Sequence, residues 1–251
     1  MDASDLAFLP AVEQMALLEE RAVSSRELLD CYLERVESLN PRLNAIVTLD
    51  YERARRRAAD ADDARFRGES WGPLHGLPIT VKDVFETEGL RTTAGSPDLA
   101  DYVPDQDAIV VRRLRDAGAI IFGKTNTPAM AADGQTYNEV FGTTNNPWDV
   151  SRTPGGSSGG CAAAVAAGLT SFSIGSDIAG SVRIPSAFCG LFGHKPTWGL
   201  VPQRGHIPGP PGSMIDRDIN TIGPLARDVR DLELALSVIV GPATQEALGW
   251  R

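Results

Sequence analysis

Two glycine- and serine-rich segments hold residues whose types and spacing could do chemistry. Residues 153–160 read Thr-Pro-Gly-Gly-Ser-Ser-Gly-Gly, and residues 175–181 read Gly-Ser-Asp-Ile-Ala-Gly-Ser. Glycine tolerates positive φ and leaves backbone N–H groups uncovered, so such segments let the main chain approach a reacting atom. A serine hydroxyl there becomes a nucleophile when a neighbouring group removes its proton. The chain must therefore also supply a base.

Lys82 is one candidate for that base. It follows the apolar run 77–81, Leu-Pro-Ile-Thr-Val, which we expect to form a strand. Burial at the end of that strand would lower the lysine pKa from ~10.4 toward neutrality, as a base at neutral pH requires. A lysine in this place is also typical of the solvated exit of a strand. The residues alone therefore leave both interpretations of Lys82 open, the buried base and the solvated end of a strand.

A histidine base is the alternative, because residues 155–159 match the G-x-S-x-G motif of the α/β-hydrolases. That motif needs an apolar strand running into the serine, whereas residues 149–154 are polar and end in proline. It also needs a late histidine. His194 precedes Lys195 and Pro196 in an expected turn, which leaves His206 as the best-placed residue. A Ser-His-Asp hydrolase is therefore the weaker interpretation.

Residues 118–125 match the phosphate-loop pattern G-x-x-x-x-G-K-[ST] letter for letter. The mechanism of that motif needs a strand, then a loop of uncovered N–H groups, then a helix. Here the four middle residues, Ala-Ile-Ile-Phe, are themselves expected to form the strand. We interpret the match as a coincidence and expect no nucleotide site.

The elements that must position these residues alternate between strand and helix signals. This alternation predicts an α/β fold, with a mixed, largely parallel sheet covered by helices. One helix is expected from about residue 12, and a second from a capping box at Ser24 and Glu27 to Asn40. Further helices are expected after Asp50, after Asp107, and over 159–168 and 228–240. Strands are expected over 45–49, 77–81, 119–122 and 171–174. We expect a single domain over 1–251, with an N-terminal helical region (1–66) and a catalytic core (73–240).

Composition narrows the classes of partner and compartment. The net charge of −9 argues against nucleic acid and anionic membranes as partners, and no apolar run is long enough to cross a bilayer. The three cysteines are far apart, so neither a metal site nor a disulfide is expected. The acidic N-terminus lacks the features of a signal peptide, and a cytoplasmic location is expected.

Several blocks of sequence together carry a resemblance to a known family. They are residues 73–83, 123–126, 143–149, 154–160, 175–185, 187–190, 194–199 and 222–227. In content and order they resemble the amidase signature family, which includes fatty acid amide hydrolase, peptide amidases and the A-type chain of glutamyl-tRNA amidotransferase. The resemblance runs collinearly from about residue 5 to residue 240 and looks closest to stand-alone bacterial-type amidases.

The resemblance implies a role for each candidate residue. In this family the lysine of the Val-Lys-Asp block is the base, the first serine of Gly-Gly-Ser-Ser-Gly-Gly follows a cis peptide bond and relays the proton, and the serine closing the second loop is the nucleophile. These roles fall on Lys82, Ser157 and Ser181. The implied oxyanion hole consists of the backbone N–H groups of Ile178, Ala179, Gly180 and Ser181. The residues expected to support the loops are Gly155, Gly156, Ser158, Asp177 and Arg183.

The implied activity is hydrolysis of a small-molecule amide through a serine acyl-enzyme, which releases a carboxylate and an amine or ammonia. Esters should also react, and no metal or organic cofactor is implied. Three alternatives remain open: a catalytically silent fragment, an A-type amidotransferase subunit, and the Ser-His-Asp hydrolase.

Two departures from the family pattern affect these expectations. Ala179 stands where the family usually has glycine, and a positive φ there would cost on the order of 1 kcal/mol. The chain also resembles only the N-terminal half of the family's domain, so we expect the C-terminal part of the fold to be missing. The expected protein partner is a second copy of the chain or a complementing C-terminal half.

Overall fold

The computed structural model describes residues 3–212, 216–243, 247 and 249. The outermost residues of the expected 1–251 domain, 1–2 and 250–251, lie outside this range. Within the described part, one sheet has the strand order β1-β3-β2-β6-β8-β7. Its strands are β1 (Ile46–Leu49), β2 (Pro78–Lys82), β3 (Ile120–Thr125), β6 (Phe172–Asp177), β7 (Phe192–Gly193) and β8 (Thr221–Ala226). A separate hairpin pairs β4 (Tyr137–Asn138) with β5 (Gly142–Thr143).

The sheet is mixed, as the sequence predicts. Its central strands β3, β2 and β6 are parallel, while β1 at one end and β8 and β7 at the other pair antiparallel. The central parallel strands are buried along their whole length, as expected when helices cover both faces. The carboxyl ends of β2 and β6 therefore lie next to each other, and these ends carry Lys82 and Asp177.

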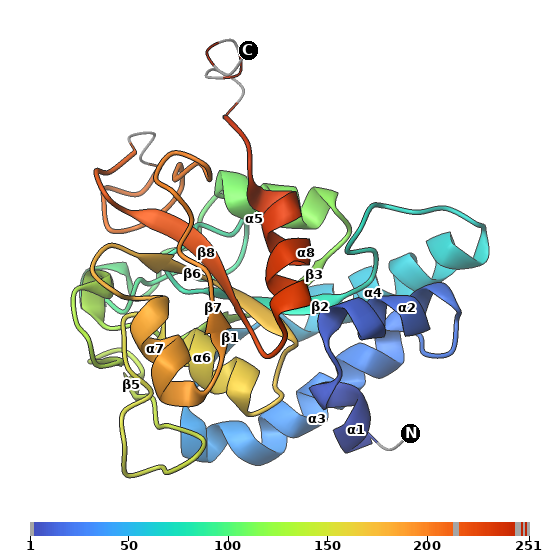
Figure 1. Cartoon of the computed structure of the whole chain (residues 1–251), viewed down its shortest axis with the longest axis horizontal. Coiled ribbons are helices and arrows are strands. Elements are labelled where there is room, and N and C mark those ends of the chain that lie inside the picture. Colours follow the sequence, from blue (N-terminus) through green and yellow to red (C-terminus); the bar gives the residue numbers. More distant parts are fainter. Residues whose placement is uncertain (1–2, 213–215, 244–246, 248, 250–251) are drawn as a thin grey trace.

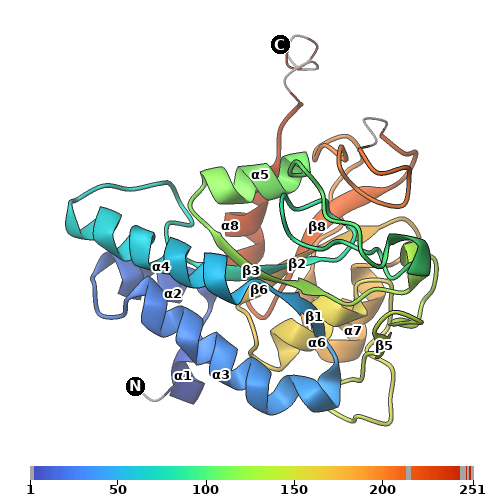
Figure 2. The same cartoon turned by 180° about the vertical axis from the view of Figure 1, so that it is seen from behind.

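Helices lie on both sides of this sheet, with α5 and α8 on one side and α3, α6 and α7 on the other (Figure 1 and, from behind, Figure 2). The helices are α1 (Ala3–Phe8), α2 (Ala11–Glu19), α3 (Ser25–Leu43), α4 (Tyr51–Phe66), α5 (Ile109–Asp116), α6 (Gly159–Ala166), α7 (Arg183–Cys189) and α8 (Val229–Ile239). Two short 3₁₀ turns cover Pro97–Leu99 and Ala129–Ala131. None of the described helices is long and apolar enough to cross a membrane.

Side-chain caps explain the starts of α3 and α8, whereas the structure corrects one expected helix end. The capping box at Ser24 and Glu27 is present, and it starts α3. The expected end at Asn40 is wrong, because proline in the last turn removes only one hydrogen bond and α3 continues to Leu43. The helices expected after Asp50 and Asp107 are present. Asp50 holds the N-cap position of α4 and Ala108 that of α5, but neither aspartate side chain caps its helix. Their carboxylates instead pair with Arg53 and Arg115.

The main hydrophobic core contains buried residues from the N-terminal helices, the central strands and α8. Tyr32 of α3, for example, stacks on Phe122 of β3 with ring centroids 6.1 Å apart. Strand β1, from the expected N-terminal helical region (1–66), pairs with β3 of the expected catalytic core (73–240). The division between these two regions stays a prediction.

Candidate active site

Lys82 is the last residue of β2 and is fully buried. Its Nζ donates a hydrogen bond to Ser157 Oγ at 2.6 Å and a second one to Ser176 Oγ at 3.2 Å. The structure thus brings together the lysine and the first serine of the Gly-Gly-Ser-Ser-Gly-Gly block, which are far apart in the sequence. Of the two interpretations that the residues alone left open, the solvated strand exit is excluded.

Burial lowers the pKa of Lys82 to about 7, and the neighbouring Cys161 and Asp177 act in the opposite direction. Removing an ammonium from water disfavours its charged form, so a lysine at this depth loses its proton far more readily than a surface lysine. A substantial fraction of Lys82 is therefore neutral at physiological pH and can accept a proton from a neighbouring hydroxyl.

The segment around Ser157 is held by local contacts rather than by regular structure. The peptide bond between Gly156 and Ser157 is cis. The Thr136 hydroxyl donates to the Gly155 carbonyl at 2.9 Å and accepts from the Gly159 N–H at 3.1 Å. Thr136 thus fastens both ends of the bend that presents Ser157. Sequence reasoning missed Thr136, which lies outside the glycine-rich segments.

The second glycine-rich segment differs from the expected loop in one respect: residues 175–177 belong to β6. Ser176 therefore sits on a strand neighbouring Lys82, and its hydroxyl accepts one of the lysine's hydrogen bonds. Sequence reasoning missed this contact too. Ser158 joins the two segments: its hydroxyl bonds the backbone of Ser176, and its N–H donates to the Ser181 carbonyl at 3.1 Å.

Asp177 organises the turn that leads from β6 into α7. Its carboxylate accepts hydrogen bonds from the N–H groups of Gly180, Val182 and Arg183, and from the Arg183 guanidinium. Burial alone would raise the pKa of Asp177, but these hydrogen bonds outweigh burial and lower the pKa to about 2. Asp177 is therefore charged at any physiological pH and fixes the shape of the turn.

That turn presents Ser181, which is half-buried, as the first residue after the positive-φ Gly180. No described residue hydrogen-bonds the Ser181 hydroxyl or accepts from the N–H groups of Ile178, Ala179 and Ser181. Of the four N–H groups expected in an oxyanion hole, that of Gly180 is the exception, because it donates to Asp177. The positive φ of 119° falls on Gly180 and not on Ala179, so the strain considered for Ala179 does not arise.

His206 offers no support for a histidine-based mechanism. It is buried and packs edge-on against Phe85, with ring centroids 5.3 Å apart. Its Nε2 has no hydrogen-bond partner among the described residues, so no serine or carboxylate there is aligned with it. Burial, followed by the charge of Lys82, lowers the pKa of His206 to about 3. Among the described residues there is also no cluster of three His, Cys, Asp or Glu side chains suited to a metal ion.

The fold and site together define a serine-containing α/β protein with a buried lysine beside its serines. Residues 27–247 match the family model described as Amidase, and the chain belongs to that family. The chain is 45% identical over 237 residues to the A-type subunit of the glutamyl-tRNA(Gln) amidotransferase from Moorella thermoacetica, an alignment that covers 94% of this chain and 47% of that protein. It is 43% identical to the Acylamidase of Rhodococcus erythropolis, in an alignment that covers 99% of this chain and 51% of that protein.

Among solved structures, the peptide amidase PAM in complex with the competitive inhibitor chymostatin superposes with a TM-score of 0.87 at 38% identity. That match covers 94% of this chain and 48% of the amidase. The chain thus spans about half the length of the relatives it matches. Identities of 45% and 43% do not separate the amidotransferase subunit from the acylamidase.

Proposed function

We propose that this chain provides the catalytic residues of an amide hydrolase that works through a serine acyl-enzyme. The observation that carries the proposal is the buried Lys82, whose pKa is lowered to about 7 by burial and whose Nζ lies 2.6 Å from Ser157 Oγ. A buried, partly neutral lysine that is hydrogen-bonded to a serine is suited to activating a hydroxyl nucleophile. Family membership supports the same reaction class.

In the proposed mechanism Ser181 Oγ attacks the amide carbonyl carbon and gives its proton to Ser157, which passes its own proton to neutral Lys82. The uncovered N–H groups around Ala179 would stabilise the developing oxyanion, typically by ~3–4 kcal/mol for each donor. As the C–N bond breaks, the proton returns from Lys82 through Ser157 to the leaving amine. Water then attacks the acyl-enzyme by the reverse relay and releases the carboxylate.

Labelling with a fluorophosphonate, followed by peptide mapping, tests this assignment of roles. We expect the label on Ser181 in the wild-type chain and strongly reduced labelling in Lys82→Ala and Ser157→Ala. The matched control is Ser237→Ala, because Ser237 lies on the exposed part of α8 and bonds only Leu234 of its own helix. A label on Ser157 would overturn the assignment of the nucleophile.

The similarity to the amidotransferase subunit favours a second candidate function. In that role, the same residues would release ammonia from an amide for transfer to a tRNA-linked glutamate, with partner chains completing the reaction. Glutamine-dependent and tRNA-dependent turnover only in the presence of partner chains would favour this function. Hydrolysis of an anilide by the chain without partners would favour the stand-alone amidase.

We further propose that the active form includes polypeptide equivalent to the other half of the relatives. An apolar surface, which we call the α7 surface, consists of the exposed side chains of Trp148, Ile184, Phe188 and Phe192. Ile184 and Phe188 are four residues apart on one helix face, and Trp148 Nε1 donates to the Cys189 carbonyl at 2.8 Å. Such a group of large apolar side chains is typical of a contact surface.

Cooperative thermal unfolding without turnover would identify the isolated chain as a silent fragment.

A further inference from the structure

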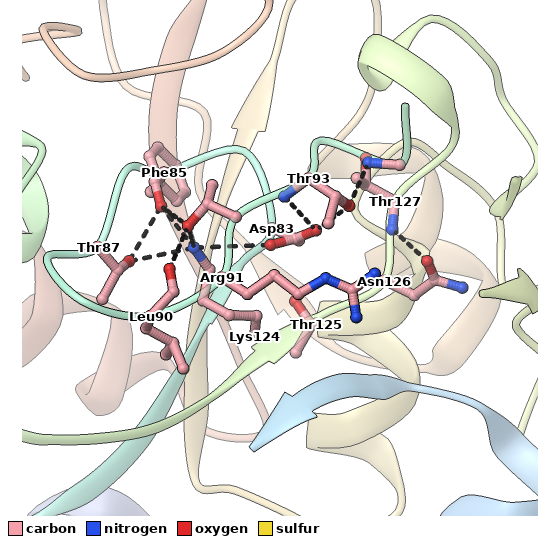
Figure 3. Close-up of polar contacts among 12 residues, drawn as sticks. Asp83, Phe85, Thr87, Leu90, Arg91, Thr93, Lys124, Thr125, Asn126 and Thr127 are labelled. Atoms are coloured by element: carbon pink, nitrogen blue, oxygen red, sulfur yellow. Dashed lines mark hydrogen bonds and ion pairs between the residues drawn. The ribbon is translucent and has the colours of Figure 1, made fainter. Parts of the chain in front are cut away.

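A second fully buried lysine, Lys124, lies on the strand next to that of Lys82. In the parallel register of β2 and β3, Val81 pairs with Lys124 and Lys82 pairs with Thr125. Side chains alternate along a strand, so the two lysines point to opposite faces of the sheet. Lys82 faces the serines. Lys124 faces the segment 83–95, which follows β2 directly (Figure 3). The proposed mechanism makes no use of Lys124.

The ammonium of Lys124 has a full set of partners in that segment. It donates to the Phe85 carbonyl at 2.5 Å, to Thr92 Oγ1 at 2.8 Å and to Thr87 Oγ1 at 3.1 Å. It also lies 3.7 Å from Asp83 Oδ1, as the dashed line in Figure 3 marks. Burial lowers the pKa of Lys124 to about 8, partly offset by Asp83, so the group is mainly charged at neutral pH.

Asp83, the other half of this ion pair, is the residue directly after Lys82. Its Oδ2 accepts from the Thr93 hydroxyl at 2.6 Å and from the Thr93 N–H at 3.0 Å. Its backbone N–H donates to the Thr125 carbonyl, and its carbonyl accepts from the Ala94 N–H. Every polar contact of Asp83 thus ties the end of β2 to β3 or to the far end of the segment 83–95.

These contacts converge on the backbone next to the proposed base. We propose that the buried Asp83–Lys124 ion pair is a positioning device, which closes the segment 83–95 against the sheet and so holds Lys82 Nζ at hydrogen-bond distance from Ser157. This inference rests on the proposed role of Lys82. Lys124 and Asp83 are positioning residues and touch no reacting atom. Burying two charges costs free energy that an apolar pair would not, which is consistent with retention for geometry rather than stability.

The first test measures fluorophosphonate labelling of Ser181 in Lys124→Met and Asp83→Asn at equal amounts of folded protein. A small displacement of a reacting group costs up to about 100-fold, so we expect the maximal labelling rate to fall ~10- to 100-fold. The half-saturating probe concentration should stay within about twofold, because no contact to the probe is removed. The double variant should lose little more than either single one, since both residues act as a unit.

Asp231→Asn is the matched control. Asp231 lies on α8, on the other side of the sheet from α6, the helix that follows Ser157 (Figure 1). It is also buried, and its carboxylate accepts hydrogen bonds from the N–H groups of Ala11 and Val12 at the start of α2. It should lower stability but leave the labelling rate per folded molecule unchanged. Unchanged labelling in Lys124→Met as well would overturn the positioning role.

A crystal structure of Lys124→Met separates this inference from the proposed function. If the wild-type chain is not labelled at all, the proposed function fails, but the structure still tests the ion pair. We expect Lys82 Nζ to move out of hydrogen-bonding distance of Ser157 Oγ in the variant. A retained distance of 2.6 Å would overturn the inference.

Discussion

At the scale of single residues, the proposed mechanism depends on the protonation state of Lys82. Only the neutral amine can accept a proton, so the labelling rate of Ser181 should rise about tenfold per pH unit below pH 7 and level off above it. The sign follows from burial, which lowers the pKa of Lys82 to about 7 by disfavouring the ammonium. Measuring the labelling rate of Ser181 between pH 5 and pH 9 tests this pH dependence. A rate that is constant over this range would show that Lys82 is not the base.

The same burial makes a prediction for stability. Because the pKa of Lys82 is about 7 in the folded state and ~10.4 in the unfolded chain, the unfolded state binds more protons between these values. The free energy of unfolding that depends on Lys82 therefore rises with pH from 7 toward 10. Lys82→Met removes this dependence. The free energy of unfolding of the variant should therefore exceed that of the wild type by about 2–4 kcal/mol at pH 6 and by much less at pH 9.5. Urea unfolding at both pH values measures the two differences, and equal differences would contradict the prediction.

Sequence reasoning reached some residues of the site and missed others for a physical reason. The Gly-Gly-Ser-Ser-Gly-Gly block and the lysine after an apolar run are local patterns, and the structure brings Lys82 and Ser157 into contact. The contacts of Ser176 and Thr136 depend on the pairing of β2 with β6 and on the path of a remote segment. Local patterns carry no information on such pairings. The roles of Ser157 and Ser181 remain predictions.

At the scale of the elements, α6 depends on the two glycines at its start. A Cβ added to Gly160 would lie 2.4 Å from Asn126 N and 2.5 Å from Asn126 O, both backbone atoms that cannot rotate away. Gly160→Ala should therefore destabilise the fold by about 1–3 kcal/mol, the usual cost of overpacking. Thermal unfolding measures the loss. Gly134→Ala is the control, since nothing lies within 4 Å of a Cβ there. Equal melting temperatures for the two variants would show that α6 can shift to make room.

Two of the elements that sequence reasoning missed, β8 and α7, contain proline. β8 includes Pro224, and proline normally argues against an inner strand because it lacks an N–H. Here the Pro224 carbonyl still accepts from the His194 N–H, while β8 pairs with β6 over six positions. α7 likewise contains Pro185 near its start, where the missing N–H costs little. In β8 tertiary contacts outweigh a local signal, whereas the amphipathic α8 was predictable from its own pattern.

At the scale of the whole molecule, the exposed apolar side chains of the α7 surface lie close in the chain to Ser181. The α7 surface lies beside β7, the end strand of the sheet, which is only two residues long. Ser181 closely precedes the start of α7, so whatever covers this surface would also border the proposed nucleophile. The chain spans about half the length of its relatives. The other half that we propose for the active form would be one such cover.

An uncovered α7 surface makes a prediction about association. Phe188 and Phe192 are 51% and 52% exposed, so the isolated chain should bury them by self-association that increases with concentration. Phe188→Ser combined with Phe192→Ser should weaken this association, while the stability changes by no more than about 1 kcal/mol because both side chains already contact water. Sedimentation velocity over a range of concentrations measures the association, and urea unfolding measures the stability. The control is Phe66→Ser at the end of α4, because Phe66 is 80% exposed and lies on another helix, with the Arg21 guanidinium over its ring. Loss of association in the control alone would move the contact surface from α7 to α4, and a wild-type chain that stays monomeric would show that the α7 surface does not drive association.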